Sequence, residues 1–293
     1  MSLKHLLPLL FLALALSPAT AQQQQQKQGK AKTQEGLFGV IERDGEYYFS
    51  IPESLLGRRI LSTVRYTSTP AATDQYGGEM VNQQTVYWET APNNNLVLRS
   101  DLMVTVSNER DAINRAVETS NCNPIIGTFK IEGHRQGNYL FKVSSFFSED
   151  NAALGIGSTA KKKLGLVGYM PQASYIESIH TFPLNTEVRT VKTWTGTSTQ
   201  TYAARQTGRV TLGLNISFVL LPETPMLPRL FDPRVGYFTD SYNVFEDYQQ
   251  RVEKKRFITR WRLEPKDSAD AERLKRGELI EPKKQIVDRK SVV

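Results

Sequence analysis

The clearest fold signal in the chain is the stretch Arg209-Val210-Thr211-Leu212-Gly213-Leu214-Asn215-Ile216-Ser217-Phe218-Val219-Leu220-Leu221. Apolar residues alternate there with polar or small ones, which is the period of a β-strand with one face in a core and the other toward water. Glu187 to Trp194 is a second candidate strand, and a connection rich in Thr, Gly and Ser separates the two. This pair indicates a β-sheet in the second half of the chain.

Turn signals place further strands on the N-terminal side of this pair. Asp44-Gly45 is a two-residue turn of the type that favours a tight hairpin, and polar tips at 92–95 and 135–138 indicate two more. The candidate hairpins are 38–43 with 46–51, 84–89 with 96–106, and 126–134 with 139–147; single strands are expected at 59–66 and 256–263. We predict a mainly β fold of antiparallel sheets, sandwich-like, with a few short helices.

Two short helices are expected among these strands. Asn108 is placed to cap a helix over 108–119, in which Ile113, Ala116 and Val117 share one face. Ser268 is placed to cap a second helix over 268–276, with acidic residues near its start and basic residues near its end.

The N-terminus carries an export signal rather than part of the fold. Lys4 precedes an apolar run from Leu6 to Leu16, and Ala19-Thr20-Ala21 is a small-residue cleavage site. We therefore expect a chain that is exported to the periplasm or outside the cell and has no membrane span. The Gln-rich segment after the signal peptide lacks apolar residues to bury, so we expect a disordered leader there.

Composition limits the function classes. The 293 residues contain one cysteine and three histidines, which excludes an intramolecular disulfide and leaves little for metal chemistry. The formal net charge is +7, and from Arg251 to the end there are 14 Lys or Arg against 8 Asp or Glu. Such a basic segment is typical of chains that bind nucleic acid, an anionic surface or an acidic protein domain.

No catalytic, cofactor or metal motif is complete. His134 and His180 lack the spacing of a zinc site, and Cys122 has no basic neighbours to activate it. The run Gly155 to Ala160 fits a dinucleotide-binding pattern, but no strand is expected before it, and a glycine loop explains it better. We assign no catalytic, cofactor-binding or metal-binding residue and expect no cofactor in this chain.

The run from Lys254 to Arg262 interleaves basic and aromatic residues. This pattern fits single-stranded nucleic acid, which export argues against, and it equally fits a strand whose aromatic face packs while its arginines pair with carboxylates. We expect no nucleic-acid partner.

Several motifs resemble the uncharacterised domains that precede the catalytic domain of large secreted bacterial zinc-dependent metalloproteases. A first, shorter unit is similar around Tyr47-Tyr48-Phe49-Ser50-Ile51-Pro52-Glu53-Ser54-Leu55-Leu56-Gly57-Arg58. A second is similar at Tyr76-Gly77-Gly78-Glu79-Met80, Ser174-Tyr175-Ile176-Glu177-Ser178, Asp232-Pro233-Arg234-Val235-Gly236-Tyr237-Phe238 and Arg256-Phe257-Ile258-Thr259-Arg260-Trp261-Arg262-Leu263-Glu264-Pro265. The resemblance covers roughly residues 36–287.

This resemblance implies a pro or accessory region of a metallopeptidase. The sequence contains no His-Glu-x-x-His motif, so we expect zinc only in a catalytic domain that is absent here, and a chain that is inactive alone. The partner implied is that catalytic domain, and a polypeptide substrate is the other candidate ligand. The residues expected at the interdomain interface are Asp232, Arg234, Tyr237, Arg256, Phe257, Arg260, Trp261 and Arg262.

The expected organisation is a signal peptide at 1–21, a disordered leader at 22–35, a short N-terminal β unit at 36–70, a main β-rich domain at 71–265, and a basic C-terminal helix with a truncated linker at 266–293. Two other functions stay open. One is a free-standing secreted module that binds protein or glycan, and the other is a hydrolase with an unrecognised site around His180.

Overall fold

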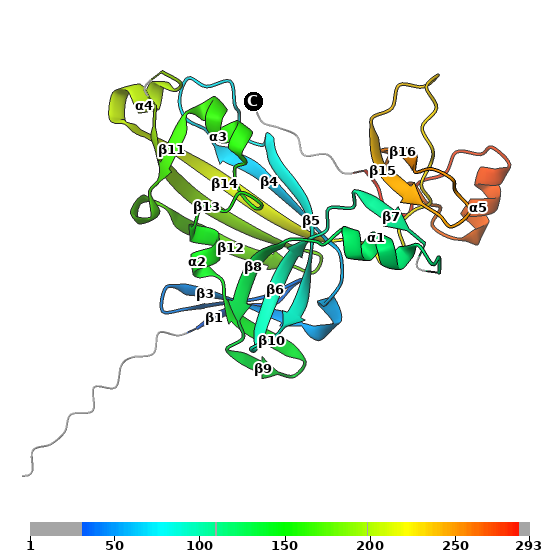
Figure 1. Ribbon diagram of the computed structural model, residues 1–293, viewed down its shortest axis with the longest axis horizontal. Coiled ribbons are helices and arrows are strands. Elements are labelled where there is room, and N and C mark those ends of the chain that lie inside the picture. Colours follow the sequence, from blue (N-terminus) through cyan, green and yellow to red (C-terminus); the bar gives the residue numbers. More distant parts are fainter. Residues whose placement is uncertain (1–30, 109, 198, 287–293) are drawn as a thin grey trace, which may run out of the picture.

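The computed structural model describes residues 31–286 apart from residues 109 and 198, so the expected signal peptide lies outside the described residues. Within that range the chain forms three β-sheets and several short helices. Figure 1 shows the two larger sheets together and the third sheet to one side of them. The prediction of a mainly β fold with antiparallel sheets is confirmed.

The eight-stranded sheet is built around β14 (Arg209–Leu220), as its alternation predicts. β14 pairs antiparallel with β13 (Asn185–Gly196) on one side and with β4 (Ile60–Ser68) on the other. Every second residue from Val210 to Phe218 is buried, and Figure 1 shows the sheet strongly curled around that buried face. The other strands are β5 (Met80–Ala91), β6 (Asn95–Ser100), β8 (Ile125–Lys130), β11 (Leu166–Tyr169) and β12 (Tyr175–Phe182).

The five-stranded sheet shares one core with the larger sheet. Its strands are β1 (Lys32–Gln34), β2 (Gly39–Arg43), β3 (Glu46–Pro52), β10 (Asn138–Lys142) and β9 (Gly133–Arg135). Aromatic rings join the two sheets: Phe141 on β10 lies 5.2 Å from Trp88 on β5, and Phe38 lies 5.6 Å from Phe218 on β14, between ring centroids. Tilted pairs of this kind add about 0.5–1.5 kcal/mol each to the burial of the rings.

Two of the three predicted hairpins form, and the third, 126–134 with 139–147, forms only at its tip, because residues 125–130 pair with β6 instead and only β9 pairs with β10. All three turns contain residues with positive φ. Asp44 and Gly45 have φ of 54° and 78°, and Asn93 and Asn94 have 64° and 57°. Residues with positive φ at both central positions make the turn whose twist matches that of two antiparallel strands. Gln136 and Gly137 have the same geometry between β9 and β10. Local chemistry therefore sets these registers.

The helices differ from prediction at their boundaries. α1 (Asn114–Ser120) begins later than Asn108, because Asn108 instead accepts a hydrogen bond from the backbone of Arg110 in a local turn. The backbone N–H groups just before α1 donate to the carboxylate of Asp247, at 2.8 Å and 3.0 Å, and Asp247 lies in the turn after the distant strand β15 (Thr239–Phe245). The remaining helices are α2 (Ser144–Ser148), α3 (Ser158–Leu164), α4 (Tyr202–Thr207) and α5 (Ser268–Lys275), with short 3₁₀ turns η1 (Glu53–Leu55) and η2 (Pro171–Ala173).

Three further sequence-based boundaries were wrong. The strand expected to run through Phe147 ends at Lys142, and α2 follows because the Ser144 hydroxyl binds the backbone of Tyr47 at 2.7 Å. The segment 148–172, expected to be a loop, contains α3 and β11. α5 is capped by Asp267, whose side chain accepts from the backbone of Asp270, and not by Ser268.

The third sheet contains β7 (Thr105–Ser107), β15 (Thr239–Phe245) and β16 (Glu253–Ile258). β7 pairs with β15 in parallel, which brings the chain before α1 beside the C-terminal part of the molecule. The strand expected over 256–263 therefore begins earlier and ends at Ile258.

Sheet pairing crosses the expected divisions of the chain. β4 lies in the eight-stranded sheet with β13 and β14, and β3 pairs with β10, so residues before and after position 70 share both large sheets. Lys32 to Gln34, expected to belong to the disordered leader, pair with β2 as β1; for these three residues that expectation was wrong. The backbone of a polar segment can complete a sheet edge without burying apolar side chains.

Candidate functional site: the C-terminal lobe

Residues 221–286, which we call the C-terminal lobe, have almost no core. Val244 is the one residue buried in this range. Figure 1 shows these residues, from yellow to red, beside the curled sheets. Twelve large hydrophobic side chains of the lobe are exposed: Leu227, Leu230, Val235, Tyr237, Phe238, Tyr248, Val252, Trp261, Leu263, Leu274, Leu279 and Ile286.

Three arginines of the expected interface hold the lobe together. The guanidinium of Arg256 lies 4.0 Å from the centre of the Phe231 ring. Arg260 donates to the carbonyl oxygen of Leu227 at 2.8 Å, and Arg262 donates to that of Thr224 at 2.9 Å. Arg256 within β16 and Arg260 and Arg262 after it thus contact the segment that follows the eight-stranded sheet.

These contacts correct the expectation that the arginines pair with carboxylates. Of the three, Arg262 alone does so, with Glu264 at 2.7 Å. A backbone carbonyl bound by a guanidinium stays satisfied without a strand partner, which explains how an irregular segment keeps its shape.

The aromatic residues of the expected interface separate into two groups. Phe257 stacks on Tyr242 with ring centroids 5.1 Å apart, so it belongs to the sheet that β15 and β16 form. Trp261 and Tyr237 are 66% and 52% exposed, and Phe238 beside Tyr237 is 89% exposed. These three side chains are large, apolar and available to a partner.

Asp232 and Arg234 form a closed turn. The guanidinium of Arg234 binds both carboxylate oxygens of Asp232, at 2.9 Å and 2.5 Å. This hydrogen-bonded cation lowers the pKa of Asp232 below its ordinary value. Because both members are satisfied within the turn and lie at the surface, we interpret the pair as a stabilised turn and not as a reactive site.

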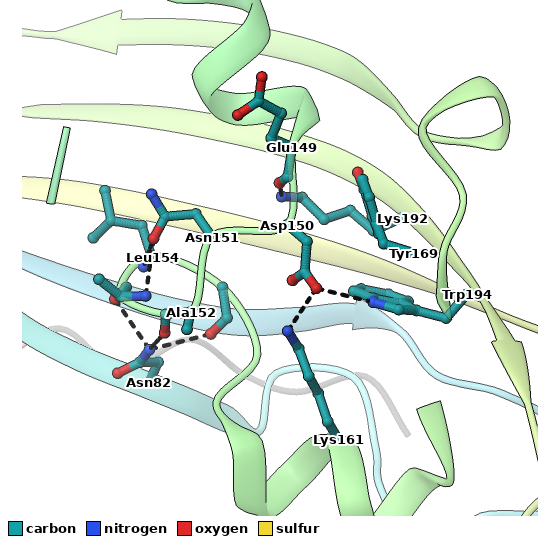
Figure 2. A network of polar contacts seen from close by, with 12 residues as sticks. Asn82, Glu149, Asp150, Asn151, Ala152, Leu154, Lys161, Tyr169, Lys192 and Trp194 are labelled. Carbon is teal, nitrogen blue, oxygen red and sulfur yellow. Dashed lines mark hydrogen bonds and ion pairs between the residues drawn. The ribbon is translucent and has the colours of Figure 1, made fainter. Parts of the chain in front are cut away.

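Sequence analysis missed a buried lysine in the curled sheet, which Figure 2 shows. Lys192 on β13 is 2% exposed, and its amine donates to the backbone carbonyl of Glu149. Beside it, one oxygen of Asp150 accepts from Lys161 at 2.6 Å and from the indole nitrogen of Trp194 at 3.3 Å. Burial of the amine lowers the pKa of Lys192 to about 8.

This network holds a segment of the chain inside the curl. Asn82 donates to the carbonyl oxygens of Ala152, Ala153 and Gly155, and Leu154 is buried. A Cβ at Gly155 would lie 2.4 Å from the carbonyl oxygen of Asn151, so packing requires that glycine. The segment is irregular and is not a strand, which removes the structural context that a dinucleotide site needs.

The other candidates for chemistry lie apart. His134 bonds Glu53 at 2.7 Å and stacks on Tyr139, while His180 lies on β12 and Cys122 is exposed after α1. Within residues 31–286, excluding 109 and 198, no group of three His, Cys, Asp or Glu side chains could hold a metal ion.

Comparison with protein families identifies both parts of the chain. Residues 78–266, more than half of the chain, match "Domain of unknown function (DUF5117)". The chain belongs to the DUF5117 family. Residues 25–69 match a second family, "Domain of unknown function (DUF5118)". No curated protein and no solved structure matches the chain.

The DUF5117 match includes most of the lobe. It ends at residue 266, so Trp261 and the three arginines lie inside it and α5 lies outside it. The gap between the two family matches, 70–77, contains the division expected between residues 70 and 71, although hydrogen-bonded sheets cross it. Among the described residues, no helix of this DUF5117 protein is long and apolar enough to cross a membrane.

Proposed function

We propose that this DUF5117 protein is a non-catalytic accessory region of a secreted zinc-dependent metalloprotease, and that its C-terminal lobe docks on the catalytic domain. The observation that carries the proposal is the burial pattern of residues 221–286, where one residue is buried and twelve large hydrophobic side chains are exposed. Soluble monomers rarely leave so many apolar side chains uncovered in so short a segment, whereas protein interfaces need them.

The residue types support docking on a protein surface. Trp and Tyr are enriched among the residues that dominate binding energy, and the lobe presents Trp261 and Tyr237 beside Phe238. A specific interface covers about 800 Å² per partner, which several large side chains and their neighbours can supply. The arginines that fix the neighbouring backbone would let these side chains bind with little loss of conformational freedom.

The metalloprotease partner is proposed from the sequence resemblance, and the lobe motifs around Asp232 and Trp261 carry part of it. The zinc ion and the catalytic residues would belong to the partner domain. Export to the periplasm or the cell exterior is proposed from the signal-peptide pattern at residues 1–21.

Calorimetric titration of the purified chain with the catalytic domain of a secreted zinc metalloprotease that carries the same two domains tests this function. We expect a complex of micromolar affinity or tighter, weakened at least tenfold by Trp261→Ala or Phe238→Ala. Tyr76→Ala is the matched control, because Tyr76 is an aromatic residue outside the C-terminal lobe and is 66% exposed. Absence of a complex, or equal weakening by the control, would contradict the proposal.

A further inference from the structure

A groove of about 1010 Å³ is lined both by residues before position 124 and by residues of the C-terminal lobe. Its lining includes residues of α1 and the turn after it and residues from 57–59 and 221–226. The segment 101–107, which leads from β6 through β7, also lines the groove, and we call it the floor. No catalytic or interface residue predicted from the sequence lies in the groove except Arg262 at its rim.

The floor presents apolar side chains. Leu102, Met103 and Val104 are 53%, 40% and 57% exposed. Met103 has a φ of 46°, a left-handed conformation that a residue with a large side chain rarely adopts. Three consecutive exposed hydrophobic residues, one of them in a strained backbone, indicate a segment shaped for contact rather than for its own stability.

The floor also carries unpaired backbone groups. β7 is the edge strand of the third sheet, and its parallel pairing with β15 uses Val104 and Val106, so the N–H and C=O of Thr105 point away from β15. Among the described residues, the backbone groups of Met103 and Thr105 make no hydrogen bond to other backbone or side-chain atoms. Met103 lies before β7 in a left-handed conformation, so the strand edge itself is presented by Thr105, which can pair with another extended chain.

Three ion pairs neutralise the arginines around the groove. Arg58 bonds Glu223 at 2.5 Å and Arg59 bonds Asp101 at 2.8 Å, and Arg262 is bound to Glu264, as described above. The carboxylate of Glu118 also lines the groove; it accepts from the amide of Asn114 at 2.9 Å and is paired with no cation among the described residues. The lining arginines are therefore neutralised, and the groove offers no free cation to an acidic ligand.

We propose that this groove binds an extended stretch of polypeptide that lacks acidic residues and carries apolar side chains. The peptide backbone would pair with Thr105, while its side chains would contact Leu102, Val104 and the lining residues 221–226. This is a second binding site, separate from the docking surface around Trp261, and it does not depend on a metalloprotease partner.

The single cysteine of the sequence permits a direct test. Cys122 is exposed and lines the groove, so the intact chain labelled there with acrylodan reports the polarity of this site. The probe is the acetylated, amidated nonapeptide Ser-Val-Thr-Leu-Ser-Val-Thr-Leu-Ser. We expect a saturable blue shift of the emission, at least tenfold weaker binding when alternate peptide nitrogens are methylated, and weaker binding when both Leu become Glu.

Two variants locate the binding. Leu102→Asp and Val104→Asp place a charge at exposed positions and should weaken binding of the nonapeptide at least tenfold without unfolding the chain. Val167→Asp is the matched control, because Val167 is a 69% exposed residue on β11. No shift up to 1 mM peptide, no effect of N-methylation, or equal loss in the control would overturn the proposal. A response from the methylated peptide would indicate a simple apolar pocket.

Discussion

At the scale of single residues, Lys192 gives the protein an unusual dependence on pH. Its pKa is lowered to about 8 by burial, while the unfolded chain keeps the ordinary value near 10.5. Between these values the unfolded state holds more protons, so the free energy of unfolding rises with pH. We expect Lys192 to contribute a rise of about 2 kcal/mol from pH 7.5 to pH 10, and Lys192→Met to abolish it, in urea denaturation at both pH values.

Lys142→Met is the control for this effect, because Lys142 is an exposed lysine whose pKa is raised by its hydrogen bond to Glu46. A raised pKa adds stability below the unfolded value and loses it as pH rises, so this variant should keep the alkaline rise. The interpretation of Lys192 fails if Lys192→Met retains the same rise as the unsubstituted chain.

At the scale of elements, the start of α5 shows which of two adjacent residues caps the helix. Both Asp267 and Ser268 are residues that cap helices, but the carboxylate of Asp267 makes the bond to Asp270 at 2.9 Å. We expect Asp267→Ala to cost α5 about 1 kcal/mol and Ser268→Ala to cost much less. Amide exchange of residues 268–275 measures both, and equal effects would mean that Asp267 is not the cap.

At the scale of the whole molecule, stability should be distributed unevenly. The curled sheet has a buried aromatic core, while residues 221–286 bury Val244 alone. Regions with few buried contacts open locally at low free energy. We therefore expect amides of β15 and β16 to exchange at least tenfold faster than those of β13 and β14 in the isolated chain. Equal protection throughout would show that the lobe is stabilised by contacts other than burial.

Binding of a docking partner should reverse that difference. If the lobe is covered, its amides gain protection while those of β13 and β14 change little, because a ligand stabilises the state that it binds. The nonapeptide should protect residues 102–105 and leave Tyr237 and Phe238 unchanged. These two protection patterns distinguish the docking surface from the groove.

The sequence by itself determined the strands and turns whose signals are local. Alternation over 209–220 fixed β14 and its buried face, and positive-φ turn residues such as Asp44-Gly45 fixed the hairpins. The sequence also shows that Trp261 lies in a segment where basic and aromatic residues are interleaved. Those properties depend on neighbours within a few residues, so they can be read without knowing the fold.

Only the tertiary structure decided which strands meet and which side chains are covered. It buried Lys192 by folding residues 149–156 into the curl, left Trp261 uncovered, and joined β7 to β15 across more than 130 residues of chain. Sequence pattern does not report such contacts, because burial depends on what the rest of the chain packs against a residue. The groove arises in the same way, because only the fold brings the segments 101–107 and 221–226 together.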